Sequence, residues 1–204
     1  SFDRRAFLSR GLPACAASCL GFSSIRLFGM SPDVAQPATA QHKFDAEMPT
    51  KLTMRQLFAQ RYGSIFIPFI KFCAASLGPD RTVEMLKAYA AESAAAAAAN
   101  LAKRLGANDI EAARKYFDPA NPNFAGAMTF TVPESTDRAF RLHVTECLWA
   151  KTFIDAKAGD LGYAAVCFGD YPSARAFNPR LELVRTKTLM QGDDCCDHRY
   201  VLKD

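Results

Sequence analysis

The chain has 204 residues and half of them are hydrophobic, which is enough to build a packed core and argues against a disordered polypeptide. The formal net charge of +4 is too small to indicate nucleic-acid binding, and no basic cluster with interleaved aromatic residues occurs. No uncharged apolar run reaches the roughly 18 residues that a membrane-spanning helix needs. These features exclude nucleic acid as a partner and predict no transmembrane span in the mature domain.

The N-terminal segment has the pattern of a twin-arginine export signal. Arg4 and Arg5 precede Phe7 and Leu8, and a weakly apolar stretch runs from Gly11 to Ile25. Ala38-Thr39-Ala40 resembles a cleavage site. We therefore expect export to the periplasm, with retention at the membrane where the leader is not removed.

The domain organisation follows from this signal. Residues 31–50 are polar and proline-rich, as in a linker. We assign residues 1–45 to the twin-arginine signal and linker, and residues 46–204 to a single α+β domain. The twin-arginine route carries folded proteins, which favours a metal or a co-exported protein subunit as passenger.

The first half of the domain has helical periodicity. Apolar residues recur every three or four positions from Met54 to Cys73, with Pro68 as a kink or break. Gly78-Pro79 ends this helix, and Asp80 is expected to cap a second helix that continues through the alanine run to Gly106. A third helix is predicted at 110–117, with Asn108 and Glu111 as its capping box.

The second half alternates between strand and helix patterns. Strands are predicted at 127–132, 139–144, 181–190 and 195–203, and helices at 145–157 and 161–168. Gly169-Asp170-Tyr171-Pro172 is expected to end the shorter helix. The predicted fold class is α+β: N-terminal helices followed by a mainly antiparallel sheet of about four strands, with one or two inserted helices.

The last strand carries chemistry. Its period of two predicts one inward face with a thiol, an imidazole and apolar groups, and one face toward water. The inward residues are Cys196, His198, Tyr200 and Leu202, and the outward ones are Cys195, Asp197, Arg199 and Lys203.

Five cysteines follow the signal segment, namely Cys73, Cys147, Cys167, Cys195 and Cys196. An oxidising compartment permits a disulfide, for which Cys147 and Cys167 are the best candidates. Buried free thiols that behave as small hydrophobic groups are the alternative.

The closing motifs resemble those of the L-2-amino-thiazoline-4-carboxylic acid hydrolase family. The resemblance rests on Cys147, on Cys167-Phe168-Gly169-Asp170, and on the segment from Gly192 to Tyr200 with Asp193, Cys196, Asp197 and Arg199. His198 stands where the family pattern has an aromatic residue. The resemblance implies a hydrolase that opens a C–N bond of a small cyclic amidine, a thiazoline-type carboxylate.

Such a reaction needs a nucleophile, a proton donor for the leaving nitrogen and a cation for the substrate carboxylate. The candidate catalytic residues are Cys147, Cys167, Asp170, Cys196 and His198. Residues two apart on a strand lie about 6 to 7 Å apart, so Cys147 or Cys167 reaching His198 is the better pair than Cys196 with His198. Arg199 or Arg175 is the candidate for binding the carboxylate.

Two other interpretations remain open. Cys147, Cys167, Cys196 and His198 have the donor atoms that zinc or another transition metal accepts, although none of them has the tight spacing of a zinc motif. Alternatively, the domain is a non-catalytic accessory or small subunit that is exported together with a cofactor-bearing partner enzyme. In the hydrolase and metal interpretations the partner of the domain is a small-molecule substrate. In the accessory-subunit interpretation it is a co-exported protein subunit.

Overall fold

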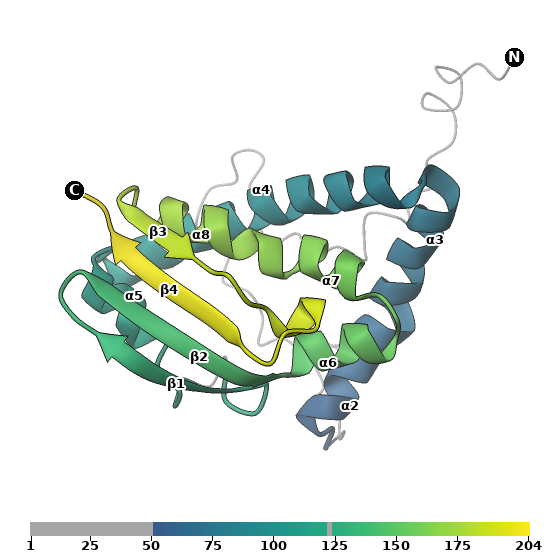
Figure 1. Cartoon of the computed structure of the whole chain (residues 1–204), viewed down its shortest axis with the longest axis horizontal. Helices are drawn as coiled ribbons and strands as arrows, with labels where there is room; N and C mark the ends of the chain where they lie inside the picture. The colour runs from purple at the N-terminus through teal and green to yellow at the C-terminus, as the bar shows by residue number, and fades with distance from the viewer. Residues whose placement is uncertain (1–50, 122–123) are drawn as a thin grey trace, which may run out of the picture. The chain divides into compact units, whose positions relative to one another are not determined.

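The computed structural model describes residues 51–121 and 124–204 (Figure 1). The predicted twin-arginine signal and the predicted linker lie outside these residues. Among the described helices, none has both the length and the apolar character needed to span a bilayer.

The first helix runs from Met54 to Leu77 in three segments: α2 (Met54–Phe58), the π-helical η2 (Ala59–Phe66) and α3 (Ile67–Leu77). Thr53 and Gln56 form a capping box at its start. The break expected at Pro68 corresponds to the change from π to α geometry just before it. Because proline has no N–H, the change falls where an intrahelical hydrogen bond is missing in any case.

Two more helices complete this half, α4 (Pro79–Leu105) and α5 (Ile110–Tyr116). Asp80 does not cap α4 as predicted, because the helix already begins at Pro79, a residue favoured at the first helical position. The cap of α5 is Asp109 rather than Asn108, and its carboxylate accepts a hydrogen bond from the Ala112 N–H at 2.8 Å. Gly106, with φ of 64°, ends α4 as expected.

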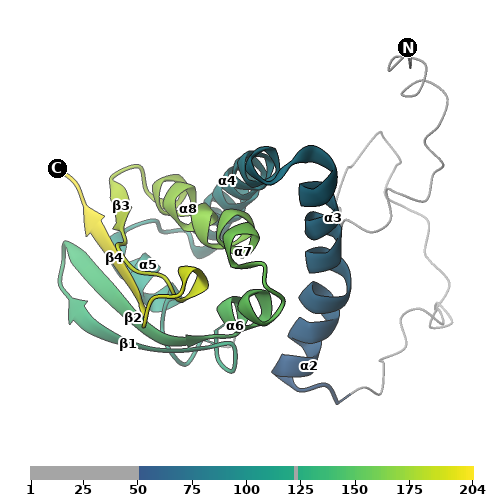
Figure 2. The ribbon, with the colours of Figure 1, turned by 45° about the vertical axis from the view of Figure 1, so that its right-hand side comes forward.

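Four antiparallel strands form one sheet in the order β1-β2-β4-β3 (Figures 1 and 2). They are β1 (Met128–Ser135), β2 (Ala139–Cys147), β3 (Leu181–Val184) and β4 (Cys196–Leu202). Helices cover one face of the sheet, and the side chains on that face are buried. The side chains on the other face point toward solvent. The predicted α+β class is confirmed.

Between β2 and β3 lie α6 (Leu148–Asp155), α7 (Gly159–Ala165), η3 (Cys167–Gly169) and α8 (Asp170–Phe177). The sequence pattern does not predict α8, because Asp170 to Pro172 has the composition of a turn. Proline is tolerated in the first turn of a helix, and Asp170 at the first position favours the helix dipole. The helix predicted at 145–157 begins later, since β2 continues to Cys147.

The predicted strand 181–190 is also too long. β3 ends at Val184, residues 185–188 are irregular, and η4 (Leu189–Gln191) is a short 3-10 turn. In this segment the backbone N–H groups of Thr186 and Lys187 bond the Asp197 carboxylate instead of a neighbouring strand.

The hydrophobic interior has two parts. One lies between the sheet and helices α4, α5 and α8, with Phe140 and Tyr200 stacked at 4.8 Å between ring centroids. The other lies among α3, α4, α6, α7 and η4, around Phe153 and Ile70. Cys147 packs against both parts, which places it at their junction.

Candidate functional site

The last strand carries a thiol and an imidazole on the helix-covered face of the sheet. Cys196 pairs with Val144 and His198 with Leu142, and both partners are buried. The predicted inward face is confirmed for these two residues, and the His198 side chain is 13% exposed. The prediction that Cys195 faces water is wrong: this residue precedes the strand and is 7% exposed.

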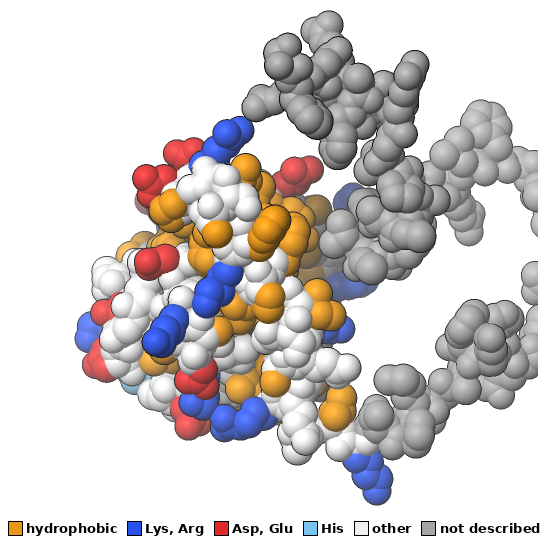
Figure 3. Space-filling model, turned by 90° about the vertical axis from the view of Figure 1, so that its right-hand side faces the viewer, with side chains coloured by type: hydrophobic (Ala, Val, Ile, Leu, Met, Phe, Trp, Pro, Cys, Tyr) orange, Lys and Arg blue, Asp and Glu red, His pale blue; other side chains and the backbone are white. Residues whose placement is uncertain are grey.

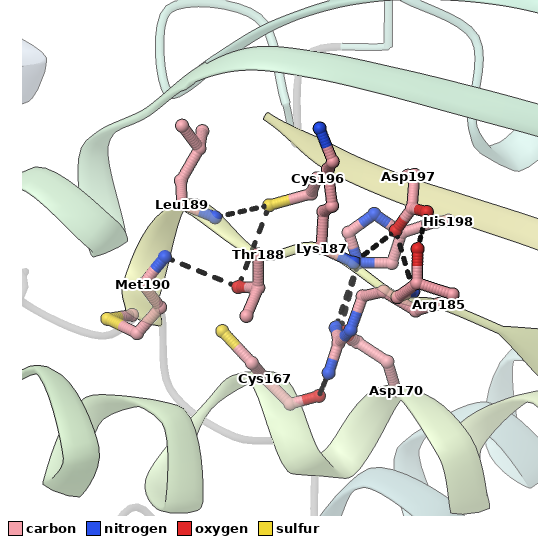
Figure 4. A network of polar contacts seen from close by, with 11 residues as sticks. Cys167, Asp170, Arg185, Lys187, Thr188, Leu189, Met190, Cys196, Asp197 and His198 are labelled. Atoms are coloured by element: carbon pink, nitrogen blue, oxygen red, sulfur yellow. Dashed lines mark hydrogen bonds and ion pairs between the residues drawn. The ribbon is translucent and has the colours of Figure 1, made fainter. Parts of the chain in front are cut away.

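A buried arginine that the sequence analysis did not single out lies at the centre of the site. The Arg185 side chain is 2% exposed, and its Nη1 donates to Oδ2 of Asp170 at 2.7 Å (Figure 4). Its Nη2 donates to the backbone carbonyl of Cys167 at 3.0 Å. The rings of Tyr171 and Tyr163 lie 5.0 and 5.4 Å from the guanidinium. Arg185 thus joins β3, η3 and α8.

Burial by itself would lower the pKa of Arg185, but the Asp170 carboxylate and the hydrogen bond to Tyr163, together with Cys167 and Tyr171, outweigh it and hold that pKa above its ordinary value. The charge at this position is therefore permanent. The alternation of buried positions along β3 could have identified Arg185 as an inward residue. Leu181 and Leu183 are buried, and Arg185 is the next residue in the same alternation.

His198 completes the network. Its Nε2 lies 3.0 Å from Nη1 of Arg185 and 3.4 Å from Oδ2 of Asp170. Arginine can only donate, so in the neutral form of the ring Nε2 accepts from Arg185 and the proton is on Nδ1. Within the part of the chain that the structure describes, this Nδ1 is buried without a hydrogen-bond partner. His198 therefore presents an unused donor.

Two aspartates of the closing motif hold the segment that carries Arg185. Asp197 accepts the N–H groups of Thr186 and Lys187 at 2.8 and 2.7 Å, and Asp193 accepts that of Thr188 at 2.7 Å. Burial raises the pKa of Asp197, but the hydrogen bonds outweigh it and the pKa is lowered overall. These two positions are structural supports of the site.

Two thiols approach each other, that of Cys196 from the sheet and that of Cys167 from the helices that cover it. The Cys196 sulfur accepts the Leu189 N–H at 3.2 Å and lies 3.8 Å from the Thr188 hydroxyl. Cys167 points from η3 toward Thr188 (Figure 4). Thr188 thus stands between the sheet thiol and the helix thiol.

A β-bulge brings in a third thiol. Met128 pairs with Cys147, but two residues later Phe130 pairs with Val144, so β2 contains one residue more than β1. Strict alternation from Val144 would turn Cys147 away from the helices. The extra residue returns it to the inward face, next to the N-terminus of α6.

All three thiols are protonated at neutral pH. Burial raises the pKa of Cys147 to about 11, against the opposing effect of the Ala150 N–H group at the start of α6. Burial and then the Asp170 charge raise the pKa of Cys167 further, and burial raises that of Cys196. Because the Asp170 charge acts on all three thiols, these groups lie within electrostatic reach of one another.

Of the two states considered for the cysteines, the structure has the free thiols: all five cysteines in the described residues are free, and Cys147 and Cys167 form no disulfide. No group of three or more metal-ligating side chains is arranged for a metal ion in residues 51–121 and 124–204. The guanidinium of Arg185 beside His198 also repels a cation. Zinc or another transition metal at Cys147, Cys167, Cys196 and His198 stays a prediction from the sequence.

A cleft of about 530 Å³ opens beside the third thiol, between α2, α6, the β1–β2 pair and η4. Cys147 lies in its wall, and two cations, Arg55 and Lys151, line it together with the carboxylates of Glu146 and Asp193. A smaller cavity of about 180 Å³ reaches Asp170 from the side of α4 and α5. The two cavities thus reach the Cys147 thiol and the Asp170 carboxyl from different sides.

The two arginines predicted to bind a carboxylate lie elsewhere. Arg199 is on the outer face of the sheet, where its Nε and Nη2 both donate to Glu134 at 2.7 Å. Arg175 is exposed on α8, with its Nη2 3.9 Å from Glu182. Of the seven predicted site residues, the network unites Cys167, Asp170 and His198, and Cys196 and Cys147 adjoin it.

Fold and site together define an α+β protein with a thiol-lined polar site beneath its terminal strand. The family model for L-2-amino-thiazoline-4-carboxylic acid hydrolase matches residues 56–200, and the chain belongs to this family. No curated protein matches it. Among solved structures, it is similar to a trafficking protein particle complex subunit 3 from Naegleria fowleri, covalently bound to palmitic acid. That match has 14% identity and a TM-score of 0.43 and covers 74% of this chain and 95% of the other.

Proposed function

We propose that this domain opens a C–N bond of a small cyclic amidine carboxylate of the thiazoline type, with Cys147 as the nucleophile. The observation that carries the proposal is the position of Cys147: it lines the open cleft, and its thiol lies within electrostatic reach of Asp170 in the interior. Family membership supports a hydrolase-like role.

The chemistry requires Cys147 to lose its proton before it attacks. In the proposed step, its sulfur forms a bond to the amidine carbon, the C–N bond breaks, and the thiol proton passes to the departing nitrogen. Water then displaces the Cys147 sulfur from this carbon, and the Cys147 thiol is regenerated. Asp170 and His198 lie behind the thiol, away from the cleft, and we propose that they take and return its proton through the interior, since the Asp170 charge acts on Cys147 and the Nδ1 of His198 has no partner among the described residues.

The cleft also supplies cations for the substrate carboxylate. Arg55 on α2 and Lys151 on α6 line it, and they replace Arg199 and Arg175 in our proposal. Among the described residues Arg55 has no ion-pair partner, whereas Lys151 lies 3.2 Å from Asp155. Arg55 is therefore the freer cation for a ligand.

The test is hydrolysis of L-2-amino-thiazoline-4-carboxylate by the purified full chain. Cys147→Ser is expected to lower kcat by about a hundredfold or more, since a hydroxyl is a far weaker nucleophile than a thiol. Arg55→Gln should raise KM and leave kcat nearly unchanged. Cys73→Ser, in α3 and outside the site, is the matched control. Full activity of Cys147→Ser would refute the assignment of the nucleophile.

We also propose that the chain reaches the periplasm by the twin-arginine route. The pattern of Arg4, Arg5, Phe7 and Leu8 supports this. Replacing both arginines with lysine should leave the protein in the cytoplasmic fraction of its host. Unchanged fractionation of that variant would contradict the proposal.

A further inference from the structure

The cavity that reaches Asp170 from the side of α4 is separate from the cleft at Cys147. The apolar side chains on the α3 side of the molecule, Phe69 and Phe72 among them, lie open on its surface (Figure 3). The apolar side chains of α4 that face α8 instead line this cavity, together with residues of α5, α8 and the sheet. It is therefore a recess built by four parts of the fold.

The two helices that form its longest walls, α4 and α8, run in the same direction (Figure 1). Just before α8, a Cβ added to Gly169 would lie 2.9 Å from the Cβ of Ala94 on α4. Just after α8, Nδ2 of Asn178 donates to the backbone carbonyl of Asn108 at 2.8 Å, past the end of α4. The start of α8 thus lies beside the alanine run, and its end lies beyond the end of α4.

This direction separates the two charged groups of the cavity. Asp170 is the first residue of α8, and Arg104 lies in the last turn of α4. Among the α4 residues that line the cavity, Ala97 is the first and Arg104 the last. At about 1.5 Å per residue, these two are roughly 10 Å apart along the helix axis. The cavity therefore has a carboxylate toward one end and a guanidinium toward the other.

Most of the remaining lining is apolar. It includes Leu101 of α4, Phe117 at the end of α5, Ala174 and Phe177 of α8, and Leu181 of β3. Walls of this kind bind the hydrocarbon part of a ligand by removing it from water. The volume of about 180 Å³ is below the roughly 300 Å³ at which pockets for drug-sized molecules begin, so a ligand for this cavity is small.

Tyr200 brings a buried hydroxyl to the cavity. The residue is 5% exposed, and its ring stacks on those of Phe140 and Phe117. Burial and then the Asp170 charge raise the pKa of Tyr200 well above its ordinary value, so the hydroxyl is protonated and lies within electrostatic reach of that carboxylate. Among the described residues it has no hydrogen-bond partner. A buried hydroxyl normally has one, which here is water or a ligand.

The two charged groups also have unused bonding capacity. The contacts of Asp170 with Arg185 and His198 both go to Oδ2, and its side chain is 39% exposed. Its Oδ1 accepts no hydrogen bond within residues 51–121 and 124–204, and Arg104 makes no ion pair or hydrogen bond there. Because a carboxylate accepts several donors and a guanidinium offers five, both ends of the cavity can bind a charged group.

We propose that this cavity is a second ligand site, which binds a short carboxylate that carries an amino group at the far end of its chain. The ammonium group bonds Oδ1 of Asp170 and the Tyr200 hydroxyl, and the carboxylate pairs with Arg104. The hydrocarbon chain lies against the apolar walls. The site does not depend on the proposed hydrolysis, because its ligand enters from the other side of Asp170.

The charges of the cavity select this class over simpler ligands. A plain amine would be repelled by Arg104 and by the guanidinium of Arg185 behind Asp170, and a plain carboxylate would be repelled by Asp170. A purely apolar molecule would displace water and leave the Tyr200 hydroxyl unpaired. An α-amino acid carries both charged groups on one carbon, too close together to reach both ends of the cavity.

The first experiment is calorimetric titration of the purified full chain with 5-aminopentanoate. We expect one molecule to bind per chain. Arg104→Gln should weaken binding by about tenfold or more, because a charge-assisted pair is lost. The matched control is Lys103→Gln, which removes a neighbouring exposed cation of α4 that does not line the cavity.

A second variant tests the buried hydroxyl. Tyr200→Phe keeps the stacked ring and removes only the oxygen, so binding should again weaken by about tenfold. The control is Tyr89→Phe, which removes a hydroxyl from an exposed position of α4. Circular dichroism and thermal unfolding of each variant show that the fold is kept.

Absence of binding at millimolar 5-aminopentanoate would overturn the proposal and leave the cavity to water. Binding that neither Arg104→Gln nor Tyr200→Phe weakens would also overturn it. Equally tight binding of pentylamine or pentanoate would refute the need for two charged groups. Cys147→Ser should bind the probe as the unaltered chain does, whereas loss of binding in that variant would place the probe in the cleft and refute a second site.

Discussion

Arg185 is held by several contacts that each need its charge and its planar shape. It bonds Asp170, His198 and a backbone carbonyl, and two tyrosine rings flank it. A buried arginine of this kind supports the site whether or not it touches substrate, because it orients both ionisable partners.

Replacing Arg185 with methionine is expected to lower the free energy of unfolding by about 3 kcal/mol, because it strands the carboxylate of Asp170. The loss stays moderate, since the Asp170 side chain is 39% exposed and water can reach it. Urea denaturation measures the change. The control is Arg175→Met, a surface arginine whose loss should cost less than about 0.5 kcal/mol. Equal costs would show that the buried network adds no stability.

Cys147 is predicted to react slowly as long as its thiol is protonated. Burial raises its pKa to about 11, so the thiolate fraction keeps growing above pH 9. Its alkylation by iodoacetamide, followed by peptide mass spectrometry, should accelerate up to about pH 11. A plateau already at pH 9 would contradict the buried environment. Binding of a substrate that lowers the pKa of Cys147 would make this thiol more reactive at neutral pH.

At the scale of elements, close packing of short helices positions the site. A Cβ at Gly162 of α7 would lie 2.6 Å from the Phe153 ring and 2.7 Å from the Met190 sulfur. A Cβ at Gly169 would similarly meet the alanine side of α4, 2.9 Å from the Ala94 Cβ. The alanine run of α4 thus lets η3 approach and brings Cys167 and Asp170 toward the sheet.

Gly162→Ala is expected to destabilise the protein by about 1 to 3 kcal/mol through overpacking against α6 and η4. Gly63→Ala is the matched control, because a Cβ added there on the exposed helix would meet no atom within 4 Å. That change should be neutral or stabilise by up to about 1 kcal/mol. Thermal unfolding compares the two. A neutral Gly162→Ala would mean that α7 packs more loosely than the structure shows.

At the scale of the whole molecule, the buried thiols link stability to alkaline pH. Their pKa values are raised in the folded state, so above about pH 9 the unfolded chain holds fewer protons than the folded one. The free energy of unfolding therefore falls as pH rises. Tyr200, whose pKa burial raises well above its ordinary value, adds the same trend at higher pH.

Urea denaturation between pH 8 and 11 should show this decline, with a slope of up to about 1.4 kcal/mol per pH unit for each proton involved. Cys147→Ala is expected to flatten the slope, and Cys73→Ala on α3 serves as the control. Stability independent of pH in this range would contradict the burial of the thiols.

Much of this architecture was accessible from sequence, because caps, breaks and alternation depend on neighbours along the chain. Gly106 ends α4, alternation turns Cys196 and His198 inward, and the closing motifs predicted the family that the family model confirms. These features involve residues only a few positions apart, so local rules describe them.

Only the tertiary structure decided which side chains meet. One extra residue in β2 turns Cys147 inward, and a one-residue shift of register cannot be seen from composition or periodicity. Arg199 pairs with Glu134 on the outer face, 65 positions away in the sequence, whereas Arg185 bends inward after β3 to meet Asp170. The energies that select these partners come from burial and long-range pairing, which exist only once the sheet and its helices have come together.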